Sequence, residues 1–450
     1  MKLPSVNSRR KVVHLFVLLI SAMLFYSCDE LYEELVRKPS KPAQEESATV
    51  VYDWYKLAGR IELRRTPQPV IILNNRNFGY IGVGLYEAVR PGIKGAVSLS
   101  TKLYQMPAMP APELAREYLW GASANAALAS MCKQLLVGLT DADKARIDSL
   151  ENAYNNRFRL SASDAVITRS QAYGRAIAAS IYNWSTTDNF NLGSQGYMLP
   201  AFPSSWVLTP PAFAAPVGSF LQNSRPFLAS NLTATAPPLP IAYSEDPASQ
   251  FYQEAKAVYD IGKALTPEQR ATANWWADAG GVGVGVPAPY HNISLITGLL
   301  ESNNAKLGRA VEVYAKTGIA MKDGPINTFR AKYQYNLLRP VTYIQRHIDP
   351  TWQSYLPSPP YPEYPSGLIG HLGPVTQVLI REFGDIPVTD NAYAWRGLAP
   401  RQYASISALR EEASFSRVYA GIHYPFTQII SVEMGKELGN NIANLDLTPN

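Results

Sequence analysis

The sequence predicts an all-α protein: a helical bundle interrupted in the middle by an ordered, proline-rich excursion. Apolar and small residues recur at helical spacing between Val166 and Ile181, as on the buried face of a helix. The run Thr266-Pro-Glu-Gln269 combines an N-cap, a proline at the first helical position and the glutamine of a capping box. No sustained alternation of apolar and polar residues predicts strands, and the sequence contains no convincing internal repeat.

The composition and the net charge of the chain limit the size of its core and the classes of partner that it can bind. The chain has 450 residues, of which 46% are hydrophobic and 17% charged, so it can bury one large core or two modest ones. The net charge is +5, and Lys and Arg cluster only at the extreme N-terminus. We therefore expect no nucleic-acid partner.

The first 50 residues predict that the protein is exported and that a polar segment tethers its folded part to a lipid anchor. Basic residues precede an apolar run from Val12 to Tyr26, which is short for a bilayer span of ~20 residues. Cys28 then resembles the cysteine of a bacterial lipobox, although Phe25 stands where that box usually has leucine. We predict a lipoprotein signal peptide over residues 1–27, lipidation of Cys28, and a polar tether over residues 28–50. The alternative is a plain signal peptide or a single anchor helix with an incidental cysteine.

Two helical halves are expected beyond the tether, at residues 51–245 and 246–450. In the first half, helices are predicted over Phe78–Val89, where a Pro-Gly pair follows, and over Pro112–Leu136. The segment Leu199–Pro240 is dense in proline, but its aromatic residues favour an ordered excursion over a free linker. The glycine-rich run Gly280–Val286 lacks both the dinucleotide-binding spacing and the lysine of a P-loop, so we interpret it as a loop.

Two polar motifs lie in the C-terminal half. Lys332 and Arg339 are seven residues apart, so their charges are expected on one face of a helix that Pro340 ends. A proline-rich run then leads to Ser366-Gly367, which should open a helix whose backbone N–H groups can face an anion. Taken singly, these motifs also fit solvated cations and an ordinary N-cap.

A third motif places an arginine before a histidine. Arg417 follows a serine, and His423, one of only five histidines, comes six residues later. Pro425 should end or kink a helix, which would put His423 near a helix terminus. A guanidinium supplies permanently charged donors and an imidazole can be nucleophile, ligand or proton carrier, so the pair suits a tetrahedral oxyanion.

Together, the three motifs resemble the signature of the superfamily of vanadium-dependent haloperoxidases and type 2 phosphatidic acid phosphatases. The likeness covers most of residues 51–442 and is greatest to the soluble bacterial haloperoxidase-like branch. It implies a helical bundle that binds vanadate or phosphate, with His423 as vanadium ligand or phosphorus nucleophile. The substrates it implies are a small oxyanion or phosphoester, or peroxide and halide. The residues it implies for oxyanion binding are Lys332, Arg339, Ser366, Gly367 and Arg417.

Two positions depart from the superfamily pattern. Leu368 stands where the pattern has a histidine after Pro-Ser-Gly, and His371, one turn further along, is the nearest substitute. Thr427 stands where the pattern has an aspartate that holds the imidazole of His423. Because threonine brings no charge, we expect His423 to be a weaker base and nucleophile, and a missing acid/base group costs ~10²–10⁴ in rate. Oxyanion binding should persist while the chemistry is reduced or altered.

Three function classes therefore stay open. The three cations and His423 favour an enzyme, either a haloperoxidase or a phosphatase, with His371 as a possible acid/base group. Leu368 and Thr427 favour a phosphate- or vanadate-binding protein without turnover. The tether and the many tyrosines and prolines favour a surface lipoprotein that uses the fold as an interaction scaffold. In each case we expect a lipid anchor in the cell envelope, at the outer membrane or the periplasmic face.

Overall fold

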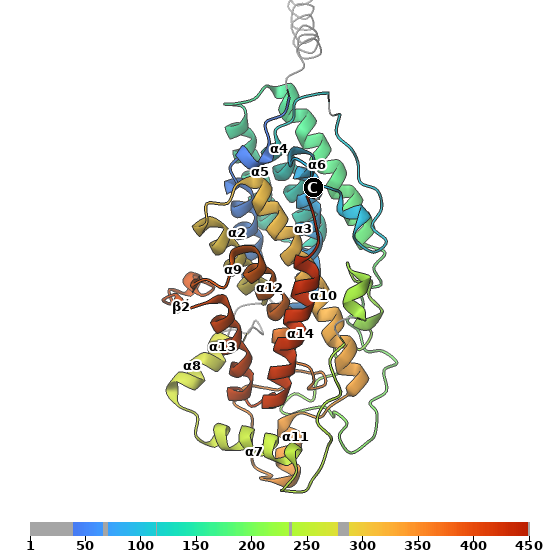
Figure 1. The fold of residues 1–450 in the computed structure, drawn as a ribbon, viewed down its shortest axis with the longest axis vertical. Coiled ribbons are helices and arrows are strands. Elements are labelled where there is room, and N and C mark those ends of the chain that lie inside the picture. Colours follow the sequence, from blue (N-terminus) through green and yellow to red (C-terminus); the bar gives the residue numbers. More distant parts are fainter. Residues whose placement is uncertain (1–38, 66–70, 114, 234–235, 278–287, 449–450) are drawn as a thin grey trace, which may run out of the picture.

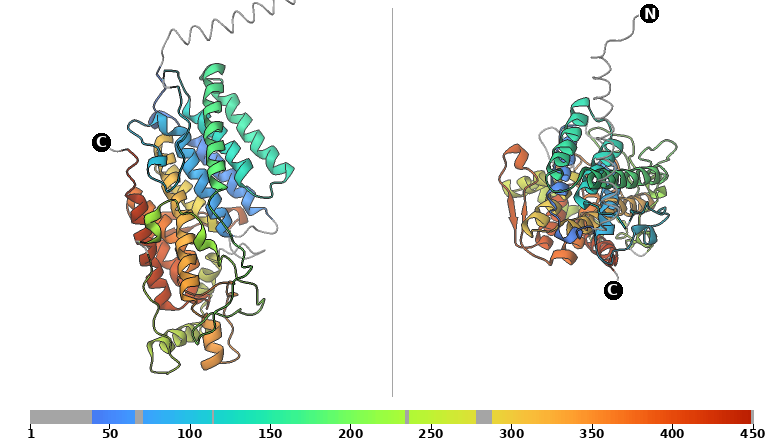
Figure 2. Two further views of the ribbon diagram at one scale, coloured as in Figure 1. Left: turned by 90° about the vertical axis from the view of Figure 1, so that its right-hand side faces the viewer. Right: turned by 90° about the horizontal axis from the view of Figure 1, so that it is seen from above.

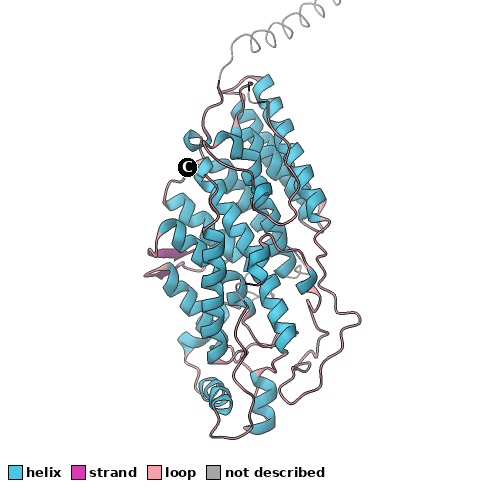
Figure 3. Ribbon diagram, turned by 45° about the vertical axis from the view of Figure 1, so that its right-hand side comes forward, coloured by secondary structure: helices cyan, strands magenta, loops and turns pink. Residues whose placement is uncertain are grey.

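The computed structural model describes residues 39–65, 71–113, 115–233, 236–277 and 288–448. The regular secondary structure of these residues is helical except for two short strands, which confirms the all-α prediction (Figure 3). The predicted signal peptide, Cys28 and the run Gly280–Val286 lie outside them. Within the described ranges, no helix is long and apolar enough to cross a membrane.

The helices form an elongated bundle in which α10 and α14 run along the long axis (Figures 1 and 2). The N-terminal half supplies α2 (Thr49–Leu63), α3 (Ile71–Val89), α4 (Trp120–Leu135), α5 (Asp141–Phe158) and α6 (Asp164–Ser185). The C-terminal half supplies α7 (Gln250–Lys263), α8 (Pro267–Trp275), α9 (Ala288–Ser302), α10 (Leu307–Tyr335), α11 (Pro340–His347), α12 (Gly367–Phe383), α13 (Ile406–Tyr419) and α14 (Pro425–Ala443). One short antiparallel pair joins β1 (Val388–Asp390) to β2 (Arg401–Tyr403).

Local sequence signals place several helix ends as expected. The Thr266 hydroxyl accepts the backbone N–H of Gln269, whose side chain accepts the backbone N–H of Thr266, so the capping box at the start of α8 is complete. By contrast, α4 begins at Trp120 and not at Pro112. Before α4, the backbone N–H groups of Tyr118 and Leu119 donate to the hydroxyls of Ser40 and Ser170 and not to carbonyls within a helix.

The two halves share one hydrophobic core, in which α10 packs against α3 on one side and α12 on the other. Small residues let these helices approach closely: a Cβ on Gly370 of α12 would lie 2.0 Å from the Thr328 hydroxyl of α10. A Cβ on Gly435 of α14 would similarly lie 2.9 Å from the Cα of Gly373 on α12. The first two turns of α12 are therefore held in place by α10 and by α14.

The folded part of the chain begins before residue 51. Ala43, Ala48 and Val50 are buried in the core, and Glu46 accepts hydrogen bonds from the backbone N–H groups of Trp120 (3.0 Å) and Gly121 (2.7 Å). Burial raises the pKa of Glu46 to about 7, although these hydrogen bonds oppose the shift. The expected tether over residues 28–50 is thus too long at its C-terminal end, because its last residues pack against α4.

The described part of the proline-rich excursion packs on the helical core, as predicted. Trp206 and Phe227 are fully buried, while Phe202 and Phe213 stay exposed. Asp323 of α10 pins the excursion by accepting hydrogen bonds from the backbone N–H groups of Phe227 (2.7 Å) and Leu228 (2.9 Å). The backbone N–H of Trp206 donates to the Asn336 carbonyl at the end of α10. The excursion is therefore hydrogen-bonded to α10 and to the turn between α10 and α11, close to the polar motifs.

Candidate active site

The three polar motifs lie at the helix ends of the C-terminal half. Lys332 is in the last turn of α10, Arg339 is the N-cap of α11, and Ser366 is the N-cap of α12. Arg417 is in the last turn of α13, and His423 lies in the short loop before α14. All five side chains are buried.

Two prolines begin helices that they were expected to end. Asn336, with a φ of 48°, terminates α10, so Lys332 and Arg339 do not share one helix face. Pro340 is instead the first residue of α11, and Pro425 is the first residue of α14. A proline costs little at that position, because the first N–H of a helix has no intrahelical acceptor.

Buried cations from separate elements act on His423. Its imidazole is nearly inaccessible, and burial is the main cause that holds its pKa well below 6.5. The positive charges of Arg339, Lys332 and Arg417 lower it further, in that order. The structure therefore brings the three predicted cations close enough to influence one imidazole, which stays neutral at physiological pH.

Lys332 and Arg339 also hold the loop over residues 359–366. The Lys332 ammonium donates to the backbone carbonyls of Pro362 (2.8 Å), Glu363 (2.9 Å) and Pro365. The Arg339 guanidinium donates from Nε and Nη2 to the Tyr361 carbonyl, at 3.2 and 3.0 Å. Burial lowers the pKa of Lys332 well below its usual 10.5, the nearby Arg339 adds to that shift, and the charge of Glu363 opposes it. The two cations thus fix a backbone path as well as supplying charge.

Glu363 is a site residue that the sequence did not reveal. Its carboxylate is fully buried and accepts from His423 Nδ1 at 2.7 Å, through Oε1. The same oxygen accepts the backbone N–H of Tyr424 at 3.1 Å, and Oε2 accepts the Thr427 hydroxyl at 2.9 Å. The prediction that Thr427 leaves His423 without a carboxylate is therefore wrong, since the carboxylate comes from another loop and Thr427 supports it.

The hydrogen bond between His423 Nδ1 and Glu363 determines which nitrogen of the imidazole carries the proton. Because Nδ1–H donates to Glu363, Nε2 keeps its lone pair, and that atom lies 3.2 Å from Arg339 Nη1. Burial raises the pKa of Glu363 to about 7, while the charges of Arg339 and Lys332 oppose the rise. An aspartate at position 427 would place a second carboxylate beside Glu363 Oε2, so threonine is the residue that fits here.

The start of α12 offers donors that suit an oxyanion. The Ser366 hydroxyl is buried and has no hydrogen-bond partner within the described residues, and it does not cap the helix. Its backbone N–H donates to the Ser431 hydroxyl at 2.9 Å. Gly367 begins the helix, whose first N–H groups have no intrahelical acceptors. An orphaned hydroxyl and an excess of buried positive charge fit a tetrahedral or trigonal-bipyramidal oxyanion such as vanadate or phosphate.

The two remaining positions of α12 are both buried. Leu368 presents an apolar side chain in the first turn. His371 Nδ1 lies 3.4 Å from the side-chain nitrogen of Asn292, which belongs to α9. This contact ties His371 to a helix that carries none of the other predicted site residues, and its acid/base role stays a prediction.

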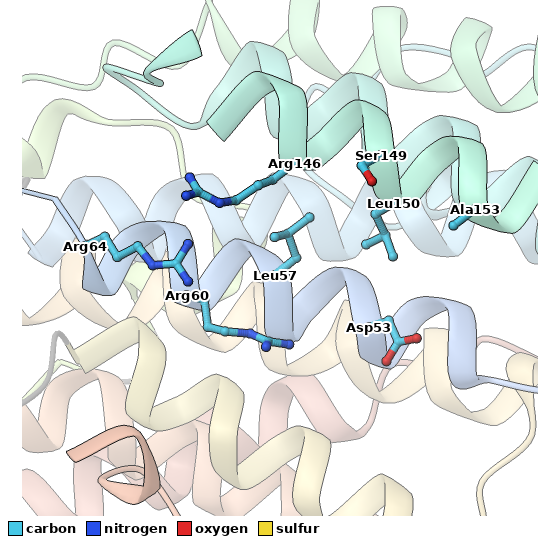
Figure 4. A pocket seen from close by; sticks show the side chains of 8 residues that line it. All are labelled: Asp53, Leu57, Arg60, Arg64, Arg146, Ser149, Leu150 and Ala153. Carbon is cyan, nitrogen blue, oxygen red and sulfur yellow. The ribbon is translucent and has the colours of Figure 1, made fainter. Parts of the chain in front are cut away.

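A separate surface groove of about 390 Å³ lies between α2 and α5 (Figure 4). Its lining includes three arginines, Arg60, Arg64 and Arg146. No residue of the candidate site lines it. Its arginines therefore offer surface positions for control substitutions.

Comparisons with known proteins give a consistent result. A family model described as the VCPO second helical-bundle domain matches residues 312–447, which contain all the predicted oxyanion-binding residues. The fold is similar to that of the first bacterial vanadium-dependent iodoperoxidase, with a TM-score of 0.79, 27% identity, and coverage of 91% of this chain and 99% of that one. A bacterial vanadium-dependent chloroperoxidase in its holo form matches with a TM-score of 0.63 and 16% identity, over 86% of this chain and 94% of that one. Among the curated proteins, no match was found.

The Glu363 bond predicts a strong effect of Glu363→Gln. The amide keeps the size but loses the charge, and its N–H can donate to Nδ1, which moves the imidazole proton to Nε2. We expect vanadate and phosphate binding, measured by calorimetry, to weaken at least about tenfold, because charge-assisted hydrogen bonds contribute ~1.5–3 kcal/mol. As control, Glu254→Gln alters a carboxylate that accepts the Phe426 backbone N–H at 3.0 Å, and it should leave binding unchanged. Equal affinity in Glu363→Gln and the parent would contradict this role.

Proposed function

We propose that this protein, whose fold and sequence motifs are those of the vanadium haloperoxidase and type 2 phosphatidic acid phosphatase superfamily, is a vanadate-dependent haloperoxidase. One observation carries the proposal. His423 is a neutral imidazole because it is buried close to three cations, and Glu363 accepts its Nδ1–H, which leaves the Nε2 lone pair on the side of Arg339. Such an atom can ligate the metal of an oxyanion whose charge the cations neutralise.

Each site residue has a defined task in this proposal. Lys332, Arg339 and Arg417 would bind the oxygens of the anion, and Ser366 Oγ and the Gly367 N–H would donate hydrogen bonds to them. Because these groups are buried and already fixed by the fold, little reorganisation accompanies binding. Bound vanadate would supply a Lewis-acidic centre that activates hydrogen peroxide for attack by halide. Phosphate has the same shape and charge class, so it serves as a redox-inert probe of the site.

Iodide is the halide that we propose as substrate. In the overall reaction, hydrogen peroxide, iodide and one proton give hypoiodous acid and water. Iodide is the most easily oxidised of the common halides, so it makes the smallest demand on a site that has Leu368 in its first helical turn. The similarity to an iodoperoxidase at 27% identity supports the same choice. Reduced activity toward bromide and chloride would agree with the absence of a histidine at position 368.

The corresponding experiment follows iodide oxidation by the absorbance of triiodide. The vanadate-loaded parent should produce triiodide, and Arg417→Ala should lower the rate at least about a hundredfold, as removal of one preorganised donor typically does. Arg64→Ala, in the surface groove between α2 and α5, is the matched control and should leave the rate unchanged. A parent that binds vanadate but oxidises no halide would favour the binding-protein alternative. Hydrolysis of a phosphomonoester by the vanadate-free parent would favour the phosphatase alternative.

We also propose that the protein is a lipoprotein anchored in the cell envelope through Cys28. The support is the basic and apolar sequence that precedes this cysteine. Cys132, the other cysteine, is a buried free thiol in α4 and would have no disulfide partner. The anchor would place the enzyme at the outer membrane or the periplasmic face, where peroxide and halide reach it from outside.

Membrane fractionation tests the anchor. Cys28→Ala should move the protein from the membrane fraction to the supernatant, because a lipid chain on this residue is the proposed attachment. Cys132→Ala should leave it in the membrane fraction. Intact-mass measurement of the parent should show a chain that begins at an acylated residue 28. An unmodified Cys28, or a retained Met1, would refute the proposal.

A further inference from the structure

The aromatic ring of Tyr361 contacts two cations of the candidate site. Its ring centroid is 4.9 Å from Lys332 Nζ and 5.3 Å from Arg339 Cζ, so both positive charges face the aromatic ring. Its backbone carbonyl accepts two hydrogen bonds from Arg339. The edge of Phe329 supports the ring at a centroid distance of 5.0 Å. The position of the ring is therefore fixed by contacts on several sides.

The Tyr361 hydroxyl lies at the start of α12. A Cβ built on Gly367 would be 3.3 Å from Oη, so this oxygen lies beside the first residue of the helix. The Ser366 hydroxyl, which is buried, makes no hydrogen bond within the described part of the chain. The Tyr361 hydroxyl and one buried hydroxyl without a partner thus occur at the same helix N-terminus, in the neighbourhood of the buried cations. An oxyanion there could accept hydrogen bonds from both.

The phenol is suited to donate and not to act as a base. Burial raises the pKa of Tyr361 above its usual value of 10, while the charges of Arg339 and Arg417 oppose the rise. The hydroxyl therefore keeps its proton at physiological pH. Leu368, in the first turn of α12, brings no polar group, so Oη can supply a further side-chain donor beside the Ser366 hydroxyl.

We propose that Tyr361 Oη donates a hydrogen bond to an oxygen of the oxyanion held by the Lys332–Arg339 cation pair, which makes Tyr361 a further ligand-binding residue. The proton stays on Oη, and no covalent bond forms or breaks. The ligand class is a tetrahedral or trigonal-bipyramidal oxyanion, of which vanadate and phosphate are the representatives. The inference rests on the proposed function, because it concerns the same site.

The substitution Tyr361→Phe tests this directly. It keeps the ring and its contacts with the cations, and it removes only the hydroxyl. We expect Kd for orthovanadate and for phosphate, measured by calorimetry, to rise about tenfold, which corresponds to ~1.4 kcal/mol. Tyr335→Phe is the matched control, because the Tyr335 hydroxyl donates to the Pro237 carbonyl at 2.9 Å, and it should leave both constants unchanged.

A second measurement does not depend on activity. Phosphate is transparent in the near ultraviolet, so its binding should give a tyrosine difference spectrum in the parent and in Tyr335→Phe. Tyr361→Phe should lack that signal. A parent that binds phosphate with no tyrosine perturbation, or a Tyr361→Phe protein with unchanged Kd, would overturn the inference and leave the proposed function intact. A parent that binds neither anion would overturn both.

Discussion

A buried hydrogen bond between the carboxylate of Glu363 and the imidazole of His423 holds the candidate site together. A carboxylate removed from water is unfavourable unless hydrogen bonds and positive charge replace its hydration. Here the hydroxyl of Thr427, a backbone N–H and His423 occupy its oxygens, and the charges of Lys332 and Arg339 oppose its protonation. Removal of any one partner would leave a buried polar group unsatisfied, so these hydrogen bonds tie the loop to the start of α14.

The helical bundle explains why this arrangement can be rigid. The first two turns of α12 are fixed by close contacts at Gly370 and Gly373, which leave no room for larger side chains toward α10 and α14. The long helix α10 carries both Lys332, at the site, and Asp323, which pins the proline-rich excursion. A site built on helix ends that are packed in this way keeps its donors in place before a ligand arrives, which is what strong oxyanion binding requires.

The sequence was informative where chemistry depends on residue type and spacing. The helical class, the capping box at the start of α8 and the helix start after Ser366 were all predictable, because each follows from local rules. Proline misled the interpretation at Pro340 and Pro425, since a proline can either end a helix or begin the next one. Glu363 was hidden for a different reason: it lies in an extended loop 60 residues before His423, and no periodicity relates the two. Only the folded chain shows that its carboxylate takes the place of the missing aspartate.

The most direct test of this account is a crystal structure of the protein with bound vanadate. The account predicts vanadium on the Nε2 side of His423, with Nδ1 still bonded to Glu363. It also predicts that the oxygens of the anion contact Lys332, Arg339, Arg417 and Ser366. Vanadate bound elsewhere, or an imidazole turned away from Glu363 when the anion is present, would contradict it.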